Sequence, residues 1–472
     1  MTLDFQLAAF LTGLLLFAAA ALAYVTTRDT LHPMICLAGI ALFLHAFLPL
    51  YLELTQATEL RGYLRQEELD YAQTIVLLAI VSLAGGVWWG AHGTLAHGRG
   101  PGLPSSATPV GLTSAARVRL GRAAAALASL GLVAWIFQIV NAGGLYAVYG
   151  QPYGWFWSDS GYVREAFQFG LPGALLLLLA RQGLRLRAAD LVWIAIGLLP
   201  LLAHGLLGAR RGPTFMALAG VAVMWYLARA RRPRPGAALL GGLAVGLLLL
   251  FLLANRDRIH LGSEEPFTGA GEAYTFAVGP GNEFVFGAAA AVNAEALDSF
   301  RWGRRYLVVL LVRPIPRALW PNKYADAADA LNIRNTEKDP QRIDFTGTLG
   351  WTGGIGAAPG GIFDLWIEFW WAYLFAVFAV GWGFGVAYRR ALSQGGFWMA
   401  LYALMTALSI YFVMQGLAAF AFRALLLGAV TWLGWRYAIG FGAPARPGRA
   451  CSRRSASALR GAAGSAGAEG SA

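Results

Sequence analysis

The sequence has few charged residues, few cysteines and almost no lysine. Only 13% of its 472 residues are charged, whereas a soluble domain typically has about 25%. Its 57% share of apolar residues excludes a mainly disordered chain. The two cysteines, Cys36 in an apolar stretch and Cys451 in a polar one, exclude a disulfide scaffold. The mean hydropathy of +0.54 indicates a membrane protein instead.

Sequence motifs for metals and nucleotides are also absent. The six histidines form no His-x-x-x-His pattern and the cysteines no Cys-x-x-Cys pair, so we expect no metal site. No Walker A loop, dinucleotide fingerprint or nucleophile elbow is present, which disfavours ATP, NAD and hydrolase chemistry. We therefore expect no cofactor. The 35 Arg and 2 Lys lie largely between apolar stretches, which favours membrane topology over nucleic-acid binding as their role.

Eleven apolar stretches are candidates to cross a membrane. We therefore predict an all-α polytopic membrane protein with about 11 transmembrane helices, within a range of 10 to 12. The stretches are too uniformly apolar to be barrel strands, which alternate. The candidates are Phe5–Tyr24, Met34–Tyr51, Ala72–Ala91, Ala123–Asn141, Ala166–Ala180, Leu191–Leu207, Thr214–Ala228, Ala237–Ala254, Phe363–Tyr388, Phe397–Leu417 and Ala424–Phe441.

The distribution of arginine over the loops predicts the orientation. The arginine-rich set of loops should be cytoplasmic, which places the N-terminus outside and the C-terminus inside. We predict that residues 1–254 form the first eight helices, 255–362 one large periplasmic loop, 363–441 the last three helices and 442–472 a disordered cytoplasmic tail. Within the loop, Glu283–Leu297 and Tyr306–Trp320 are predicted to be interfacial helices.

Three arginines at the predicted outer ends of spans are candidates to bind a phosphorylated substrate. Arg210 and Arg211 share a very short outer loop, where the orientation rule disfavours positive charge. Paired guanidiniums at such a place suit a phosphate or pyrophosphate, which they can bind bidentately. Arg423, at the start of the last span, could join the same cluster. The alternative for each is a side chain that anchors the helix end at the lipid surface. For Arg210 and Arg211, a second alternative is that the orientation is reversed at this loop.

The segment Val312–Lys323 is a second candidate for substrate binding. Pro314 and Pro316 favour an extended backbone, along which Arg313, Arg317 and Lys323 are spaced with Trp320 between them. An indole beside basic groups suits a sugar attached to phosphate, because the ring stacks on the sugar while the cations hold the phosphate. The alternative is a rigid loop clamped on the lipid surface.

A base for an acceptor hydroxyl must be an acid or a histidine on the outer side. The candidates are Glu283, Asp364 and His260. Asp364 and Glu368 lie four residues apart, on one helical face at the mouth of the ninth predicted span. The alternatives are structural pairing with arginine for the acids and a packed or solvated side chain for the histidine.

The sequence resembles a known family, the O-antigen polymerases (Wzy) and related oligosaccharide repeat-unit polymerases. The resemblance rests on the layout of most of the chain and on four local features. These are the arginine loop Gly208–Pro213, the segment Ile315–Lys323, the run Pro359–Phe363 entering a span, and Arg423. The family often has an even number of spans with both ends inside, which differs from the eleven predicted here.

The resemblance implies a function and a setting for the protein. It implies a fold similar to the GT-C membrane glycosyltransferases, in the bacterial inner membrane. The implied activity is glycan polymerisation at the periplasmic face, independent of metals and nucleotides, from undecaprenyl-pyrophosphate-linked oligosaccharide to a second lipid-linked unit. Membrane lipids are the other expected partners, with a chain-length regulator as a further candidate and no nucleic acid. Arg210, Arg211, Arg313, Arg317 and Arg423 would then bind the pyrophosphate, with Trp320 and Lys323 in the substrate site. The alternatives are an O-antigen ligase, a polysaccharide or lipid transporter, and a receptor or assembly scaffold.

Overall fold

The computed structural model describes residues 3–55, 64–93, 111–152, 165–267, 283–333 and 358–440. Over these ranges helices are the regular secondary structure, and no strand occurs. The α-helices are α1 (Phe5–Thr27), α2 (Pro33–Leu42), α3 (Leu48–Leu54), α5 (Gln66–His92), α6 (Ser114–Asn141), α7 (Leu145–Tyr149), α9 (Gly170–Ala180), α10 (Ala188–Leu206), α11 (Arg211–Ala228), α12 (Pro235–Ala254), α14 (Glu283–Ala296), α15 (Arg304–Leu307), α16 (Lys323–Ala330), α18 (Gly360–Phe369), α19 (Tyr373–Ser393), α20 (Phe397–Met414) and α21 (Leu417–Ile439). The π-helices η1 (Phe43–Phe47) and η3 (Val308–Val312) and the 3₁₀ turns η2 (Phe167–Phe169) and η4 (Trp370–Ala372) complete the set.

The predicted all-helical fold is confirmed over the described residues, and its long apolar helices are compatible with a multi-pass membrane protein. In the described ranges, nine helical segments are long and apolar enough to cross a membrane. Two other predicted spans are also helical: the short apolar helix Phe167–Ala180 and the 18-residue α11. Helix formation is therefore confirmed at all eleven positions, while the number that cross a membrane stays a prediction.

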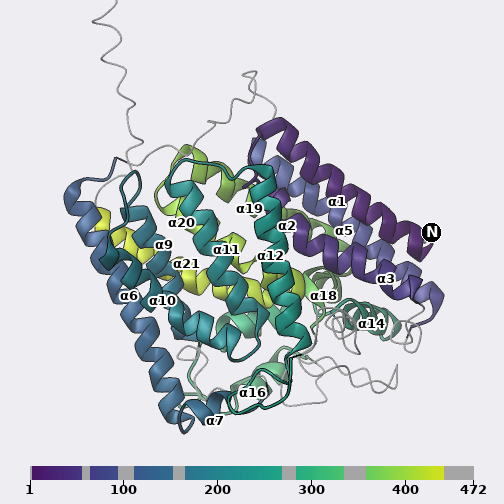
Figure 1. The fold of residues 1–472 in the computed structure, drawn as a ribbon. Helices are drawn as coiled ribbons and strands as arrows, with labels where there is room; N and C mark the ends of the chain where they lie inside the picture. The colour runs from purple at the N-terminus through teal and green to yellow at the C-terminus, as the bar shows by residue number, and fades with distance from the viewer. Residues whose placement is uncertain are drawn as a thin grey trace, which may run out of the picture.

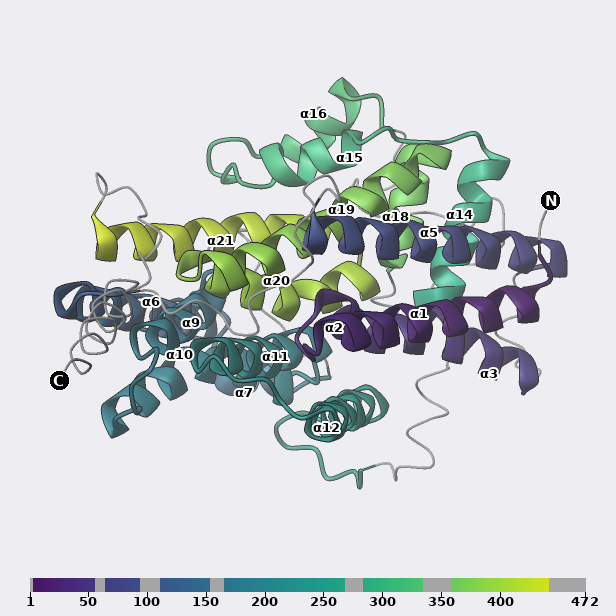
Figure 2. The same ribbon diagram turned by 90° about the horizontal axis from the view of Figure 1, so that it is seen from above.

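The helices form one bundle, seen from two directions in Figures 1 and 2. In both views α1 and α5 lie at one side and α6 at the other, with α11, α20 and α21 between them. The α12 helix lies on the outer surface of this bundle (Figure 2), and only 11% of its apolar window is buried. Apolar side chains such as Leu239 and Leu240, 73% and 67% exposed, face outward along it, as is normal for a helix in contact with lipid.

Close packing of α5 against α19 is made possible by glycine. A methyl group at Gly385 would collide with the Val87 carbonyl oxygen and lie 2.5 Å from the Ala91 nitrogen. Small residues let the two backbones approach, which is the usual way that helices associate where lipid removes the hydrophobic driving force. By contrast, Gly383 on the same helix has no atom within 4 Å of such a methyl group.

The ninth predicted span, Phe363–Tyr388, is not one continuous helix. It is divided into α18 and α19 by η4, where Trp370 has a positive φ of 48°. A helix at Glu283–Leu297 is confirmed, while its interfacial position stays a prediction. This stretch forms α14, whose Phe284 is fully buried with its ring 6.0 Å from that of Phe5 and 6.1 Å from that of Phe363.

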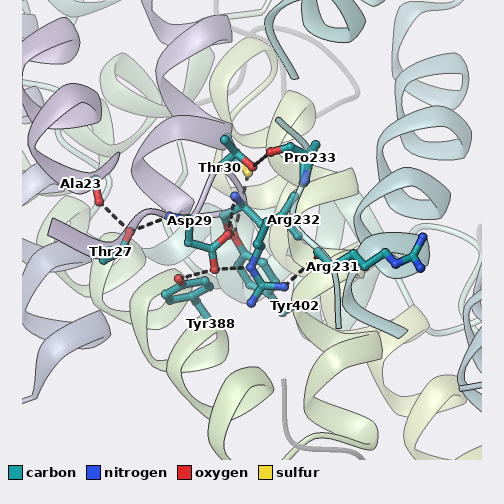
Figure 3. Close-up of polar contacts among 11 residues, drawn as sticks. Ala23, Thr27, Asp29, Thr30, Arg231, Arg232, Pro233, Tyr388 and Tyr402 are labelled. Atoms are coloured by element: carbon teal, nitrogen blue, oxygen red, sulfur yellow. Dashed lines mark hydrogen bonds and ion pairs between the residues drawn. The ribbon is translucent and has the colours of Figure 1, made fainter. Parts of the chain in front are cut away.

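A polar network joins the ends of several helices at the end of the bundle where α1 and α11 finish (Figure 3). The Arg232 Nε atom lies 2.7 Å from Asp29 Oδ2, which also accepts a 2.7 Å hydrogen bond from the Tyr388 hydroxyl. Nearby, the Thr30 hydroxyl donates to the Pro233 carbonyl. These contacts attach the start of α12 to the turn between α1 and α2.

Several predictions lie outside the described residues. The tail 442–472 is one of them, and so are residues 268–282 and 334–357 of the predicted loop. The remaining part of that loop contributes α14, α15, η3 and α16.

Candidate functional site

A cavity of about 210 Å³ lies where α10 and α20 end and α11 and α21 begin. Its described lining is rich in arginine, with four guanidinium groups and one carboxylate, an excess of three positive charges. The polar lining residues are Glu165, Gln168, His204, Arg210, Arg211, Arg256, Tyr411, Gln415 and Arg423. A cavity with this charge is suited to an anion.

Two of these arginines lie at the N-terminus of α11. Arg210 is the N-cap residue and Arg211 the first residue of the helix. The chain reverses there through Ala209, which has a positive φ of 48°, and the Arg210 N–H donates a 2.7 Å hydrogen bond to the Gly205 carbonyl. The N-terminus of a helix carries a partial positive charge, which adds to that of the two side chains.

Arg423 reaches the same cavity from α21. Its guanidinium lies 4.2 Å from the centre of the Tyr411 ring and donates a 3.1 Å hydrogen bond to the Ala419 carbonyl. Its Nη2 atom also lies 3.3 Å from Oε1 of Glu165. These contacts fix the position of the guanidinium at the cavity wall.

Glu165 brings a further predicted residue, Arg313, next to the cavity. Its Oε1 atom lies 3.1 Å from Arg313 Nη2, and its Oε2 accepts a hydrogen bond from the Gln168 amide. Arg313 also lies over the Phe422 ring, 4.5 Å from its centre. The structure thus brings together Arg210, Arg211, Arg313 and Arg423, which were selected from the sequence.

The other residues of the Val312–Lys323 segment lie apart from the cavity. The Lys323 ammonium is buried and donates hydrogen bonds to the carbonyls of Arg313 and Ile315. Burial, followed by the positive charges of Arg317 and Arg313, lowers the pKa of Lys323. Trp320 donates its indole N–H to Asp326. Lys323 and Trp320 therefore hold the segment together, and the exposed Arg317 does not line the cavity.

Two of the three candidate bases from the sequence, His260 and Asp364, do not line the cavity either. His260 lies in the turn after α12, with its backbone N–H 3.1 Å from the Arg258 carbonyl. Glu283 is the first residue of α14, and its side chain lies outside the described part of the structure. Asp364 belongs to a separate buried cluster.

This second cluster pairs Asp364 and Glu368 with Arg305. The Arg305 side chain is 6% exposed, and its guanidinium contacts Asp364 and lies 2.7 Å from Oε1 of Glu368. Burial lowers the pKa of Arg305, but the two carboxylates outweigh that effect and raise it above its usual range, so the guanidinium stays charged. Asp364 also accepts 2.8 Å hydrogen bonds from the Tyr306 hydroxyl and from the N–H of Leu417, at the start of α21. Its lone pairs are therefore occupied, and we do not propose it as a base.

Sequence reasoning missed Glu165, Gln168, Arg256, Tyr411 and Gln415 as lining residues. Glu165 directly precedes an apolar stretch and Arg256 follows one closely, so each has the sequence signature of an ordinary helix-end residue. Their position at the ends of spans on the side of Arg210 was the available signal. Among the described residues no group of three or more His, Cys, Asp or Glu side chains could hold a metal ion.

Comparisons with known proteins add no relative. No family model matches the chain, and neither a curated protein nor a solved structure is significantly similar to it.

Proposed function

We propose that the protein is a membrane glycosyltransferase that polymerises lipid-linked oligosaccharide repeat units, as the resemblance to O-antigen polymerases implies. The observation that carries the proposal is the cavity at the ends of the bundle helices, where four arginines from distant parts of the sequence meet. Guanidinium groups bind pyrophosphate through paired, charge-assisted hydrogen bonds. In this proposal the fold is GT-C-like, and the cavity opens to the periplasmic face of the bacterial inner membrane.

The proposed reaction uses undecaprenyl pyrophosphate as the leaving group. A hydroxyl oxygen of the acceptor sugar forms a bond to the anomeric carbon of the donor, and the bond from that carbon to the pyrophosphate oxygen breaks. The electron pair leaves with the pyrophosphate, and the hydroxyl proton passes to a base. Negative charge develops on the leaving oxygen. Arg210, Arg211 and Arg423 would stabilise that charge from their positions in the cavity wall, without rearrangement.

The experiment compares surface-polysaccharide ladders in a strain lacking the gene and complemented with variants. Loss of one donor that stabilises developing charge typically lowers turnover by about 10²–10³-fold, so Arg210→Ala and Arg211→Ala should reduce the ladder to single repeats on lipid A. Arg317→Ala is the matched control, because this exposed arginine lies outside the cavity. Immunoblots of the membrane fraction verify equal protein levels.

Three other outcomes contradict the proposal. A full ladder from a variant with alanine at Arg210, Arg211 and Arg423 excludes the cavity as the site. Accumulation of lipid-linked polymer with no repeat on lipid A identifies a ligase, which uses the same donor. Retention of single repeat units on the cytoplasmic side identifies a transporter.

A further inference from the structure

Glu165 provides the one carboxylate among the described residues that line the cavity. It is 3% exposed. One of its oxygens is shared by Arg313 and Arg423, and the other accepts from Gln168. A carboxylate therefore lies between Arg313 and Arg423.

A carboxylate and a diphosphate compete for the same guanidinium groups. A diphosphate carries more charge and more acceptor oxygens than a carboxylate, and Arg210, Arg211 and Arg256 lie in the same cavity wall to hold it. Arg423 can take part without moving far, because the Tyr411 ring and the Ala419 carbonyl also hold it in place. Once Arg423 binds a phosphate oxygen, Glu165 loses one of its charge-assisted contacts.

The geometry points to Glu165 as an internal counter-ion of the cavity arginines that becomes the general base when the donor diphosphate binds. This inference rests on the proposed function. The two arginines occupy the acceptor positions of Glu165 Oε1, and loss of the Arg423 contact leaves one of these positions available to the acceptor hydroxyl. The carboxylate then takes the proton of the acceptor hydroxyl as that oxygen bonds to the anomeric carbon and the diphosphate leaves with the bonding electron pair. When the diphosphate departs, Glu165 releases the proton to water and contacts Arg423 again.

Donor binding and acceptor activation would therefore be linked. A hydroxyl group that enters before the donor meets a carboxylate held by two arginines, whereas one that enters after it meets an available base. The predicted order is donor first, acceptor second.

The test measures binding of inorganic pyrophosphate to the purified full-length protein in nanodiscs by calorimetry. Glu165→Gln removes the competing charge but keeps the shape, so we expect it to tighten pyrophosphate binding by about tenfold while glycan transfer falls by about 10²-fold or more. Glu67→Gln is the control, because it makes the same charge change at an exposed residue in the first turn of α5. It should alter neither quantity.

The direction in which Glu165→Gln changes pyrophosphate affinity distinguishes the inference from a purely structural role of Glu165. If Glu165 only holds the arginines in position, Glu165→Gln weakens pyrophosphate binding, and that result, like unchanged binding, overturns the inference. Glu165→Asp covers the case in which the glutamine variant does not fold. It keeps the charge but shortens the side chain, so kcat for glycan transfer should fall at least about tenfold. Pyrophosphate affinity should stay within about threefold of that of the wild type. An unchanged kcat refutes the role of Glu165 as the general base.

If the proposed function itself is wrong, the same binding experiments give a different set of results. If wild-type protein binds no pyrophosphate, or binds it equally well after Arg210→Ala, the donor site itself is wrong and both proposals fall. If Arg210→Ala abolishes binding but Glu165→Gln does not tighten it, only the inference about Glu165 is wrong.

Discussion

Removing Arg305 should destabilise the protein far more than removing its neighbour Arg304. The Arg305 side chain is 6% exposed, and its partners Asp364 and Glu368 are 2% and 0% exposed. Deleting one partner of such a buried pair leaves an uncompensated charge and typically costs about 3–5 kcal/mol. Total stabilities are of the order of 5–15 kcal/mol, so this loss is a large part of the whole.

Two observations set the expected magnitude within that range. Without Arg305, two carboxylates are left facing each other, which favours the upper end. However, Asp364 keeps its hydrogen bonds from Tyr306 and Leu417, and Glu368 keeps a 2.9 Å bond from the Gly303 N–H. Because these donors offset part of the loss, we expect Arg305→Met to destabilise the protein by about 4 kcal/mol.

The assay is unfolding by sodium dodecyl sulfate in mixed micelles, followed by tryptophan fluorescence. Arg304→Met is the control, because this adjacent arginine is exposed and its loss should stay within about 0.5 kcal/mol. The triple variant Arg305→Met/Asp364→Asn/Glu368→Gln should recover most of the loss, because it leaves neither carboxylate without its guanidinium partner. The reasoning fails if Arg305→Met and Arg304→Met are equally stable, or if the triple variant is as unstable as the single one.

Three further predictions concern other parts of the molecule. Gly385→Ala should destabilise the α5–α19 contact by about 1–3 kcal/mol in the same unfolding assay, while Gly383→Ala should be neutral. Equal effects of the two substitutions would show that Gly385 is not needed for the close approach of α5 and α19. Burial, and then the charge of His92, lowers the pKa of His32 to about 3. As the pH falls, the His32 imidazole therefore binds a proton in the unfolded chain before it does so in the folded protein. The free energy of unfolding should then decrease by up to about 1.4 kcal/mol per pH unit below pH 6.5. His32→Asn, which keeps an acceptor at the helix N-cap, should flatten that decline in pH-dependent unfolding. Lys323→Met should speed chymotrypsin cleavage near Trp320, since the segment loses the hydrogen bonds from Lys323 to the Arg313 and Ile315 carbonyls. Unchanged cleavage would show that these two hydrogen bonds are dispensable.

The helices and part of the cavity could be predicted from the sequence. Apolar stretches must form helices in lipid, because the backbone has no other hydrogen-bond partner there. Arg210 and Arg211 were identifiable because their positive charges contradict the orientation rule. Arg423 was identifiable as an arginine at a helix end on the same predicted side.

The pairing of charges could not be predicted. Glu165 is separated from Arg313 by 148 residues and from Arg423 by 258, and Arg305 from Asp364 by 59. Local patterns contain no information on contacts at such distances. The sequence correctly placed Asp364 and Glu368 on one helix face, but the arginine that they face comes from a different element. The break at Trp370 was also hidden, since the apolar run continues across it.

The buried cluster around Arg305 has a consequence for how the chain enters the membrane. Each charged residue of an isolated helix opposes insertion, by up to about 2.5–3.5 kcal/mol at the centre of a span. Arg305 is synthesised 59 residues before Asp364, so it has left the ribosome by the time that α18 reaches the translocon. Docking of α15 onto α18 would neutralise both carboxylates as they arrive. Biogenesis of α18 and the helices after it should therefore depend on α15, a segment that is made earlier.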